Sequence, residues 1–330
     1  MRAINIAKYG DPIVVKQIAK PKLVGPKDVL IKMHFAPINP SDIFYLKGVY
    51  GIKKPLPTTG GFEGCGIIED AANKSLIGKK VSCWAGEDNY NYGTWADYFL
   101  TVEKDCIVYN QNEQVHEQDW HKYSSPFINP FTACSFLDLA KAKKAECVVF
   151  QAASSAVARM AIKLFHQEGI KSIAIVHEKN YLDEIKEIGA THVFHDQDEH
   201  LVEHLQEIIA KEKAKMLFDP ITGPLSGAIF NALKADGQLV TYGKIHRNML
   251  CDIDPPGLFF KRKSIRGFWL PDYLKEKTPQ DVERFKQLVH DNIHTIFQTR
   301  VNKVFPLEQI EEAYRESAKH GELGKNILKF

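Results

Sequence analysis

Between Cys147 and Gly243, short apolar runs alternate with stretches of helical periodicity, and this alternation is the strongest constraint on the fold. The apolar runs have strand length and occupy residues 147–150, 172–176, 191–194, 216–219 and 238–241. Strands that alternate with amphipathic helices form a parallel sheet with helices on both faces, and such sheets bind ligands at the carboxyl ends of their strands. We therefore predict an α/β protein that contains a doubly wound parallel sheet.

The turn between the first of these strands and the next helix, residues 151–158, consists mostly of small side chains. Six of its eight residues are Ala or Ser. A turn that binds a diphosphate needs free backbone N–H groups, the positive end of a helix dipole and side chains that permit close approach. The fingerprint G-x-G-x-x-G is absent, however, and Ser154 or Ser155 is also suited to cap a helix. Dinucleotide binding and ordinary helix packing both remain open from this turn alone.

Length and composition narrow the class of protein. A chain of 330 residues is too long for one ordinary domain, so we expect two. Its 44% hydrophobic and 25% charged residues are typical of soluble globular proteins, and a net charge of +2 gives no indication of nucleic-acid or membrane-surface binding. No apolar run has the length of a membrane span, and the N-terminus reads directly as a strand. Six scattered cysteines favour a reduced, cytoplasmic protein.

The first 120 residues have a different texture, with short apolar runs separated by turn residues. Strand-like runs lie at residues 4–6, 29–33, 66–68, 80–83 and 95–100. This pattern predicts a small β-rich domain that precedes the α/β unit. Near the end of the chain, residues 280–297 have apolar residues at helical spacing, which predicts a helix.

Several short motifs lie in a fixed order along the chain. They are INPSD at 38–42, GVYG at 48–51, GGFEG at 60–64, GTWADY at 93–98, NPFTA at 129–133 and SIRGFWL at 264–270. Together they resemble the medium-chain dehydrogenase/reductase superfamily, and within it the branch of zinc-independent quinone oxidoreductases and trans-2-enoyl thioester reductases. The resemblance implies a Rossmann cofactor-binding domain at 123–264. It also implies a β-rich GroES-like catalytic domain that is discontinuous in sequence, at 1–122 and 265–330, and a homodimer.

Many members of this superfamily are zinc alcohol dehydrogenases. The positions that match their Cys and His ligands hold Asn39 and Phe62, and neither side chain is a zinc ligand. We therefore predict no metal. Reduction of a conjugated C=C–C=O needs no Lewis acid, because the charge spreads over an enolate that hydrogen-bond donors stabilise. This chemistry favours activated double bonds or quinones as substrates.

The resemblance implies three residues of the reaction site. Tyr50 matches the tyrosine that polarises the carbonyl or protonates the α-carbon in enoyl thioester reductases, a role that suits a neutral phenol. Trp269 matches a tryptophan that lines the substrate pocket, and Asn39 matches the residue that faces the nicotinamide in quinone reductases. Each also has an ordinary structural interpretation, as a packed aromatic ring or a turn residue.

The resemblance also implies a set of cofactor-binding residues. They are Asn39, Thr132, Ser154, Ser155, Ala156, Val157, Tyr242, Gly243, Phe268, Trp269 and Lys325. After the second strand, a basic cluster binds the 2′-phosphate of NADP and an acid binds the ribose of NAD. Here His177, Lys179 and His195 favour NADPH, whereas Glu178 keeps NADH open.

We therefore expect an enzyme that uses NADPH, without zinc, to reduce an activated C=C bond in a small molecule. A 2-enoyl thioester is the first candidate, with Tyr50 as proton donor. A quinone or small-enone reductase is the alternative. A different class also remains, a cofactor-binding protein with a structural or RNA-binding role, as in the crystallins of eye lenses; the near-neutral charge gives it little support.

Overall fold

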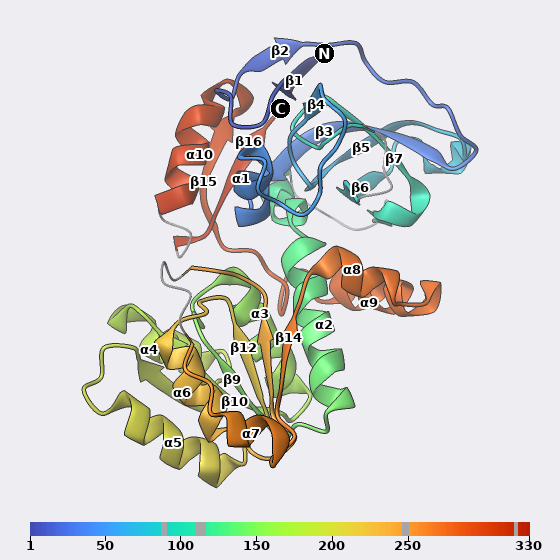
Figure 1. Ribbon diagram of the computed structural model, residues 1–330. Helices are drawn as coiled ribbons and strands as arrows, with labels where there is room; N and C mark the ends of the chain where they lie inside the picture. Colours follow the sequence, from blue (N-terminus) through green and yellow to red (C-terminus); the bar gives the residue numbers. More distant parts are fainter. Residues whose placement is uncertain (87–90, 110–116, 246–250, 320–322) are drawn as a thin grey trace. The chain divides into compact units, whose positions relative to one another are not determined.

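The computed structural model describes residues 1–86, 91–109, 117–245, 251–319 and 323–330 (Figure 1). The chain divides into two compact units, which are described separately. The terminal unit comprises Met1–Asn129 and Pro279–Phe330, and the central unit comprises Pro130–Thr278. These limits differ from the expected ones after residues 122 and 264. Phe127 and Ile128 bond to Glu63, and residues 264–267 pair with the central sheet, so each segment stays with its bonding partners.

The central unit is built on a sheet in which neighbouring strands run parallel. Its strands are β9 (Cys147–Phe150), β10 (Lys171–Val176), β11 (His192–His195), β12 (Met216–Asp219), β13 (Gln238–Thr241) and β14 (Ser264–Gly267). Their spatial order is β11-β10-β9-β12-β13-β14, and each neighbouring pair is parallel. This is the order of a Rossmann sheet, so the predicted doubly wound fold is confirmed.

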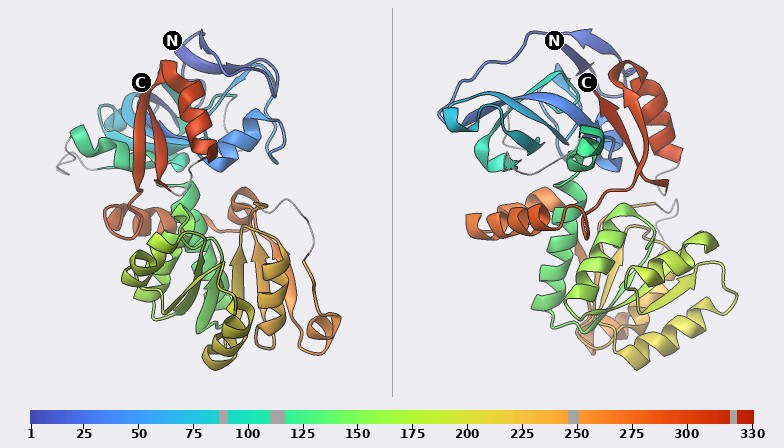
Figure 2. Two further views of the ribbon diagram at one scale, coloured as in Figure 1. Left: turned by 90° about the vertical axis from the view of Figure 1, so that its left-hand side faces the viewer. Right: turned by 180° about the vertical axis from the view of Figure 1, so that it is seen from behind.

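Helices cover both faces of this sheet (Figure 2). The helices of this unit are α2 (Ile128–Ala142), α3 (Ala156–Gln167), α4 (Leu182–Glu187), α5 (Leu201–Glu212), α6 (Pro224–Ala232), α7 (Pro255–Phe259) and α8 (Leu270–Lys275), with a 3₁₀ turn η4 (Lys179–Tyr181). Val149 of β9 belongs to the core formed with Ile209 of α5 and Phe230 of α6. The next residue, Phe150, contacts Phe165 of α3 at a ring-centroid distance of 5.4 Å. Because successive side chains point to opposite faces, a run of four buried apolar residues serves both layers.

The terminal unit is β-rich. Its elements before the central unit are β1 (Arg2–Ile6), β2 (Val15–Gln17), β3 (Asp28–Pro37), α1 (Pro40–Leu46), β4 (Thr58–Thr59), β5 (Glu63–Ala71), η1 (Lys74–Leu76), β6 (Lys80–Trp84), β7 (Tyr98–Val102), η2 (Glu103–Asp105), β8 (Cys106–Val108) and η3 (Glu117–Ser124). Those after it are α9 (Pro279–Asp291), β15 (Val301–Pro306), η5 (Leu307–Gln309), α10 (Ile310–Lys319) and β16 (Lys325–Lys329). The larger sheet has the order β15-β16-β3-β5-β6-β8, with β7 also paired to β3, and the smaller one has the order β2-β1-β4.

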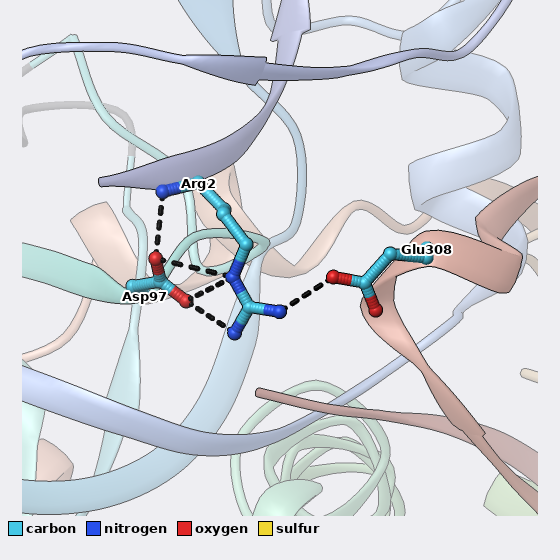
Figure 3. A network of polar contacts seen from close by, with 3 residues as sticks. All are labelled: Arg2, Asp97 and Glu308. Atoms are coloured by element: carbon cyan, nitrogen blue, oxygen red, sulfur yellow. Dashed lines mark hydrogen bonds and ion pairs between the residues drawn. The ribbon is translucent and has the colours of Figure 1, made fainter.

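The end of the chain is an integral part of this unit. β16 pairs antiparallel with β3, with Leu328 opposite Ala36. Arg2 adds a polar connection, shown in Figure 3: its guanidinium donates to Asp97 at 2.8 Å and to Glu308 at 2.5 Å. Residues from the first strand, from the stretch before β7 and from η5 are thereby joined, which explains why the tail folds with the first 129 residues.

Some predicted elements have other limits in the structure. The helix after the turn expected at residues 151–158 begins at Ala156, so the small-residue turn is shorter than expected. The strand expected at 95–100 lies at Tyr98–Val102, because the backbone of Trp95 bonds instead to Ile4 and Gly60. The helix expected to reach residue 297 ends at Asp291, where the Asn292 side chain bonds back to the carbonyl of Leu288. No helix in the described part of the chain is long and apolar enough to cross a membrane.

Candidate functional site

Asn39 is held by hydrogen bonds on both sides of its side-chain amide. It lies between β3 and α1 and is buried. Its Nδ2 donates to Glu63 Oε1 at 3.0 Å, and its Oδ1 accepts from the ammonium of Lys325. Its backbone N–H donates to Asp42 Oδ2 at 2.8 Å. The orientation of this amide is therefore fixed by residues that lie as many as 286 positions away in the sequence.

The groups around Asn39 form a buried ionisable cluster, which we call the Asn39 cluster: Asn39, Asp42, Glu63 and Lys325. All four are buried. Burial raises the pKa of Asp42 to about 7 and also raises the pKa of Glu63, although Lys325 opposes both shifts. Burial lowers the pKa of Lys325, against the attraction of Glu63 and Asp42. The ammonium of Lys325 thus bonds to Asn39 and attracts two buried carboxyl groups, where the sequence predicted a contact with a cofactor.

Tyr50 and Phe62 belong to one aromatic group. Tyr50 follows α1 and is half-buried. Its ring centroid lies 5.4 Å from that of Phe62. The buried Tyr45, which belongs to α1, has its ring centroid 5.1 Å from that of Phe62. Phe62 and Asn39, which stand at the positions of zinc ligands in the related dehydrogenases, are therefore engaged in packing and hydrogen bonding. Within the described ranges, no three His, Cys, Asp or Glu residues are grouped to hold a metal ion.

The carboxyl edge of the central sheet contains the predicted diphosphate turn. Ser155 is the N-cap residue of α3 and makes no side-chain capping bond, so the N–H groups of the first helical turn, which includes Ala156 and Val157, are not capped by it. Ser154 lies in the turn and accepts a bond from Arg159 through its carbonyl. These features fit the binding of a dinucleotide diphosphate.

Two hydroxyl groups at this edge add to the fit. Neither Ser155 Oγ nor Tyr242 Oη, both buried atoms, has a hydrogen-bond partner of good geometry among the described residues. Burial raises the pKa of the Tyr242 phenol, and the nearby Ser155 hydroxyl acts in the opposite direction. Buried polar atoms are usually paired, so a ligand with polar oxygen atoms suits this position.

A third polar group behind the turn, formed by Gln151, Asp219 and Ser226, is fully buried. Gln151 Nε2 donates to Ser226 Oγ at 2.9 Å and to Asp219 Oδ1 at 3.2 Å. Asp219 also accepts the backbone N–H groups of Ile221 and Thr222. These bonds fix the turns after β9 and β12. Gln151 directly follows one predicted strand and Asp219 ends another, and this position at the strand ends is the signal in the sequence that indicates both.

A cavity of about 670 Å³ lies at the carboxyl ends of β13 and β14. Its lining residues are Thr241, Tyr242, Gly243, Arg266, Gly267, Phe268, Trp269, Asp272, Tyr273 and Glu276. Four residues predicted from sequence, Tyr242, Gly243, Phe268 and Trp269, are thus brought together. The charged residues of the lining, Arg266, Asp272 and Glu276, were not predicted. They reach the cavity because of the register of β14 and the position of α8, which the sequence does not indicate. Thr132 is buried on α2 and is not part of this lining.

His177 and Lys179 follow β10, and His195 is the last residue of β11, where it is in register with Val176. His195 Nε2 donates to the carbonyl of His177 at 2.8 Å, and its Nδ1 accepts the N–H of Gln197 at 3.3 Å. His177 Nδ1 lies 2.7 Å from Asp196 Oδ2. The structure therefore brings the two predicted histidines together and adds a carboxylate that the sequence analysis did not single out.

Two family models match the chain. One, described as "Alcohol dehydrogenase GroES-like domain", matches residues 25–111, and the other, described as "Zinc-binding dehydrogenase", matches residues 156–289. Mitochondrial enoyl-[acyl-carrier-protein] reductases are among the relatives. That of Caenorhabditis elegans is 31% identical over 265 residues, which cover 76% of this chain and 72% of the relative. That of Rattus norvegicus is 28% identical and covers 99% of this chain and 88% of the relative.

Solved structures of similar proteins have the same fold over the whole chain. A putative NADPH:quinone reductase from Mesorhizobium loti has a TM-score of 0.84 at 29% identity, with 100% of this chain and 98% of that chain covered. The structure of an Etr1p/NADP/crotonyl-CoA complex has a TM-score of 0.81 at 20% identity, with 100% and 99% covered. At that identity, the second likeness concerns the fold alone.

Proposed function

Since the chain belongs to the medium-chain dehydrogenase/reductase superfamily, in its branch of quinone oxidoreductases and enoyl reductases, and is an oxidoreductase, we propose that it reduces the C=C bond of a 2-enoyl thioester with NADPH. The relatives named for enoyl reduction support the substrate class, and the relative named as an NADPH:quinone reductase supports the cofactor. The observation that carries the proposal is the cavity beside Tyr242 and Trp269, because residues that sequence comparison assigned separately to cofactor and substrate line one space.

The central unit provides groups for the cofactor. We assign the diphosphate to the uncapped N-terminus of α3 with Ser154 and Ser155, and the adjacent sheet edge to Tyr242 and Gly243. We also assign Thr132 and Phe268 to the cofactor, as the family resemblance implies. When bound, the reduced nicotinamide supplies a hydride to the β-carbon of the enoyl group. The protein has to bind, orient and protonate the substrate.

Tyr50 is assigned as the proton donor. Protonation of the α-carbon completes the reduction, and a phenol is neutral near pH 7 and can donate toward the developing enolate charge. Tyr50 is only half-buried, which leaves its side chain accessible to a substrate. Asn39 is assigned to face the nicotinamide, with its amide fixed by Glu63 and Lys325. Trp269 is assigned to the acyl chain.

The proposal is tested by NADPH consumption with a short and a long trans-2-enoyl thioester, a simple enone and a quinone. We expect thioester turnover, and a fall of roughly 10²- to 10⁴-fold in Tyr50→Phe. Tyr45→Phe is the matched control, because Tyr45 packs on the same Phe62 ring and should retain the activity. Quinone turnover that Tyr50→Phe leaves unchanged would instead support a quinone reductase. Binding of RNA that depends on salt, without turnover of any acceptor, would contradict an enzymatic role.

A homodimer is part of the proposal. β14 lies at the edge of the sheet in the described part of the chain, and exposed Ile265, Phe259 and Phe260 lie on or before it. Exposed strand edges pair readily with another chain, and apolar patches of this kind favour an interface. Light scattering should give the mass of two chains, and Ile265→Lys should reduce it to that of one. A single-chain mass for the unmodified protein would contradict the dimer.

A further inference from the structure

The segment that carries Tyr50 joins α1 to β4 and contains no helix or strand of its own. We call it the Tyr50 loop, residues 47–57. Near its start, Gly48 has a φ of +71° and donates to the carbonyl of Tyr45, in the last turn of α1, at 2.9 Å. Tyr50 follows two residues later and is half-buried. Without a regular backbone ladder around it, the position of Tyr50 depends on the contacts of the loop with other segments.

Tyr9, in the connection between β1 and β2, lies against the start of the Tyr50 loop. A Cβ atom placed on Gly48 would lie only 2.7 Å from the Cβ of Tyr9. The two segments therefore approach as closely as a glycine permits. The next N–H along the chain, that of Gly10, donates to the carbonyl of Leu46 at 2.8 Å, directly before the loop. The connection between β1 and β2 thus fixes the point where the chain leaves α1.

The hydroxyl of Tyr9 bonds to the second half of the same loop. Its Oη donates to the carbonyl of Lys54 at 3.1 Å and accepts the N–H of Lys54 at 3.0 Å. One side chain thus bonds to both backbone groups of a loop residue, as a neighbouring strand does in a sheet. The Lys54 ammonium adds a bond to the carbonyl of Tyr92 at 2.9 Å. The chain is therefore held both before and after Tyr50.

Aromatic contacts connect the same two tyrosines by a second route. The ring of Tyr9 lies edge-on to that of Tyr45, with 5.4 Å between the ring centroids. Tyr45 and Tyr50 both contact the ring of Phe62, at 5.1 Å and 5.4 Å. All of these residues belong to the terminal unit. Both the backbone of the Tyr50 loop and the ring beside Tyr50 are thus linked to Tyr9.

We propose that Tyr9 is a positioning residue for Tyr50, because its bonds to Lys54 and its contact with Gly48 fix the loop on both sides of the assigned proton donor. The inference rests on the proposed function, since it concerns the proton donor of the same reaction. A donor transfers its proton only from within hydrogen-bond reach of the acceptor. A displacement on the order of 1 Å therefore lowers the rate of protonation, even when the substrate binds as before.

Tyr9→Phe tests the proposal, because it keeps the ring and removes both bonds to Lys54. With a trans-2-enoyl thioester and NADPH, we expect kcat to fall roughly tenfold and the KM for the thioester to stay unchanged. Added to Tyr50→Phe, the same change should cause no further fall. Tyr109→Phe is the matched control. It removes a buried hydroxyl that lies 2.9 Å from Ser82 Oγ in the same unit, and it should retain the full kcat.

Hydrogen exchange followed by mass spectrometry tests the contact without turnover. Peptides that cover residues 48–57 should exchange faster in Tyr9→Phe than in the unmodified protein, and peptides of β3 and β5 should exchange as before. Equal exchange of the loop in both proteins would show that the hydroxyl does not hold it. Faster exchange throughout the terminal unit would show a general loss of structure. Either result overturns the proposal.

The outcomes also separate this proposal from the function on which it rests. Faster exchange of the loop with an unchanged kcat would overturn the positioning role alone. A further fall in kcat when Tyr9→Phe is added to Tyr50→Phe would do the same, because Tyr9 would then act without the Tyr50 hydroxyl. If the unmodified protein reduces no enoyl thioester, the proposed function fails and the positioning role fails with it, whatever the exchange of the loop.

Discussion

The Asn39 cluster and the carboxyl edge of the central sheet both bury polar atoms, but they differ in how those atoms are satisfied. Around Asn39, amide, ammonium and carboxylate groups from distant parts of the chain bond to one another. At the sheet edge, the hydroxyls of Ser155 and Tyr242 have no such partner among the described residues. The first region is bonded within the chain, except that Asp42 Oδ1 has no partner of good geometry among the described residues, and it should contribute to stability. The second should contribute little until a ligand binds.

The largest predicted effect is on the Asn39 cluster. Lys325→Met removes the ammonium that bonds to Asn39 and offsets the buried charge of Glu63. Its removal leaves the buried Oδ1 of Asn39 without this donor and takes away the positive charge that attracts the buried Glu63 and Asp42, so we expect a loss of about 3–5 kcal/mol in the free energy of unfolding. Urea unfolding followed by tryptophan fluorescence measures it, because Trp84, Trp95 and Trp120 lie in the terminal unit.

Lys303→Met is the control for this measurement. Lys303 lies on β15, beside the strand of Lys325, and pairs with Glu312 at 3.1 Å on the surface. Exposed pairs contribute about 0–1 kcal/mol, so the control should be nearly as stable as the unmodified protein. Adding Glu63→Gln to Lys325→Met should recover part of the loss. Equal stability of the two lysine variants would remove the distinction between the cluster and an ordinary surface pair.

Asp42 should make this unit sensitive to pH. Its pKa is raised from 3.8 to about 7 by burial, so the unfolded chain loses this proton at lower pH than the folded one. The free energy of unfolding therefore falls as the pH rises from about 4 to 7. Asp42 contributes up to about 4 kcal/mol to this fall. Relative to the unmodified protein, Asp42→Asn should therefore gain stability across that window. Parallel stability curves of the two proteins between pH 4 and 8 would contradict the shifted pKa.

The central sheet was the more predictable of the two regions. The bounds of β9, β12 and β13 agree with the apolar runs in the sequence, because strands buried on both faces are continuous apolar segments. Since parallel sheets bind ligands at the carboxyl ends of their strands, Tyr242 and Trp269 were expected at one edge, and they line the same cavity there. Local sequence is sufficient for such a region, since each strand carries its own signal.

The Asn39 cluster could not be predicted in the same way. Lys325 and Asn39 meet only because β16 pairs antiparallel with β3, and no local pattern indicates which strand lies beside which. Asp196 was not predicted for another reason: the residues expected to bind a phosphate are basic, whereas Asp196, which bonds to His177, is a carboxylate directly after β11. Residue type at a strand end is readable from sequence, but its hydrogen-bond partner depends on the register of the neighbouring strand.

Within the central unit, Ser226→Ala tests a polar group that is paired. Ser226 Oγ accepts from Gln151 Nε2 at 2.9 Å and from the N–H of Gly223 at 3.0 Å. Its removal leaves two buried donors unsatisfied and should cost about 1–3 kcal/mol in urea unfolding followed by circular dichroism. Ser75→Ala, at an exposed turn, should cost only about 0.5 kcal/mol. A neutral Ser226→Ala would mean that the turns after β9 and β12 do not depend on these bonds.

Tyr242→Phe should have the smallest effect on the protein without ligand. Its hydroxyl is buried without a partner of good geometry, and deleting such a group is neutral or slightly stabilising, within about 0.5 kcal/mol. The same variant should lose part of the rise in melting temperature that NADPH produces, because the hydroxyl is then absent from the edge where we place the cofactor. Ser155→Ala should behave alike, since the two hydroxyls are neighbours. A large loss of stability without nucleotide would make the sheet edge a structural region like the Asn39 cluster. An unchanged response to NADPH would place the cofactor away from Tyr242.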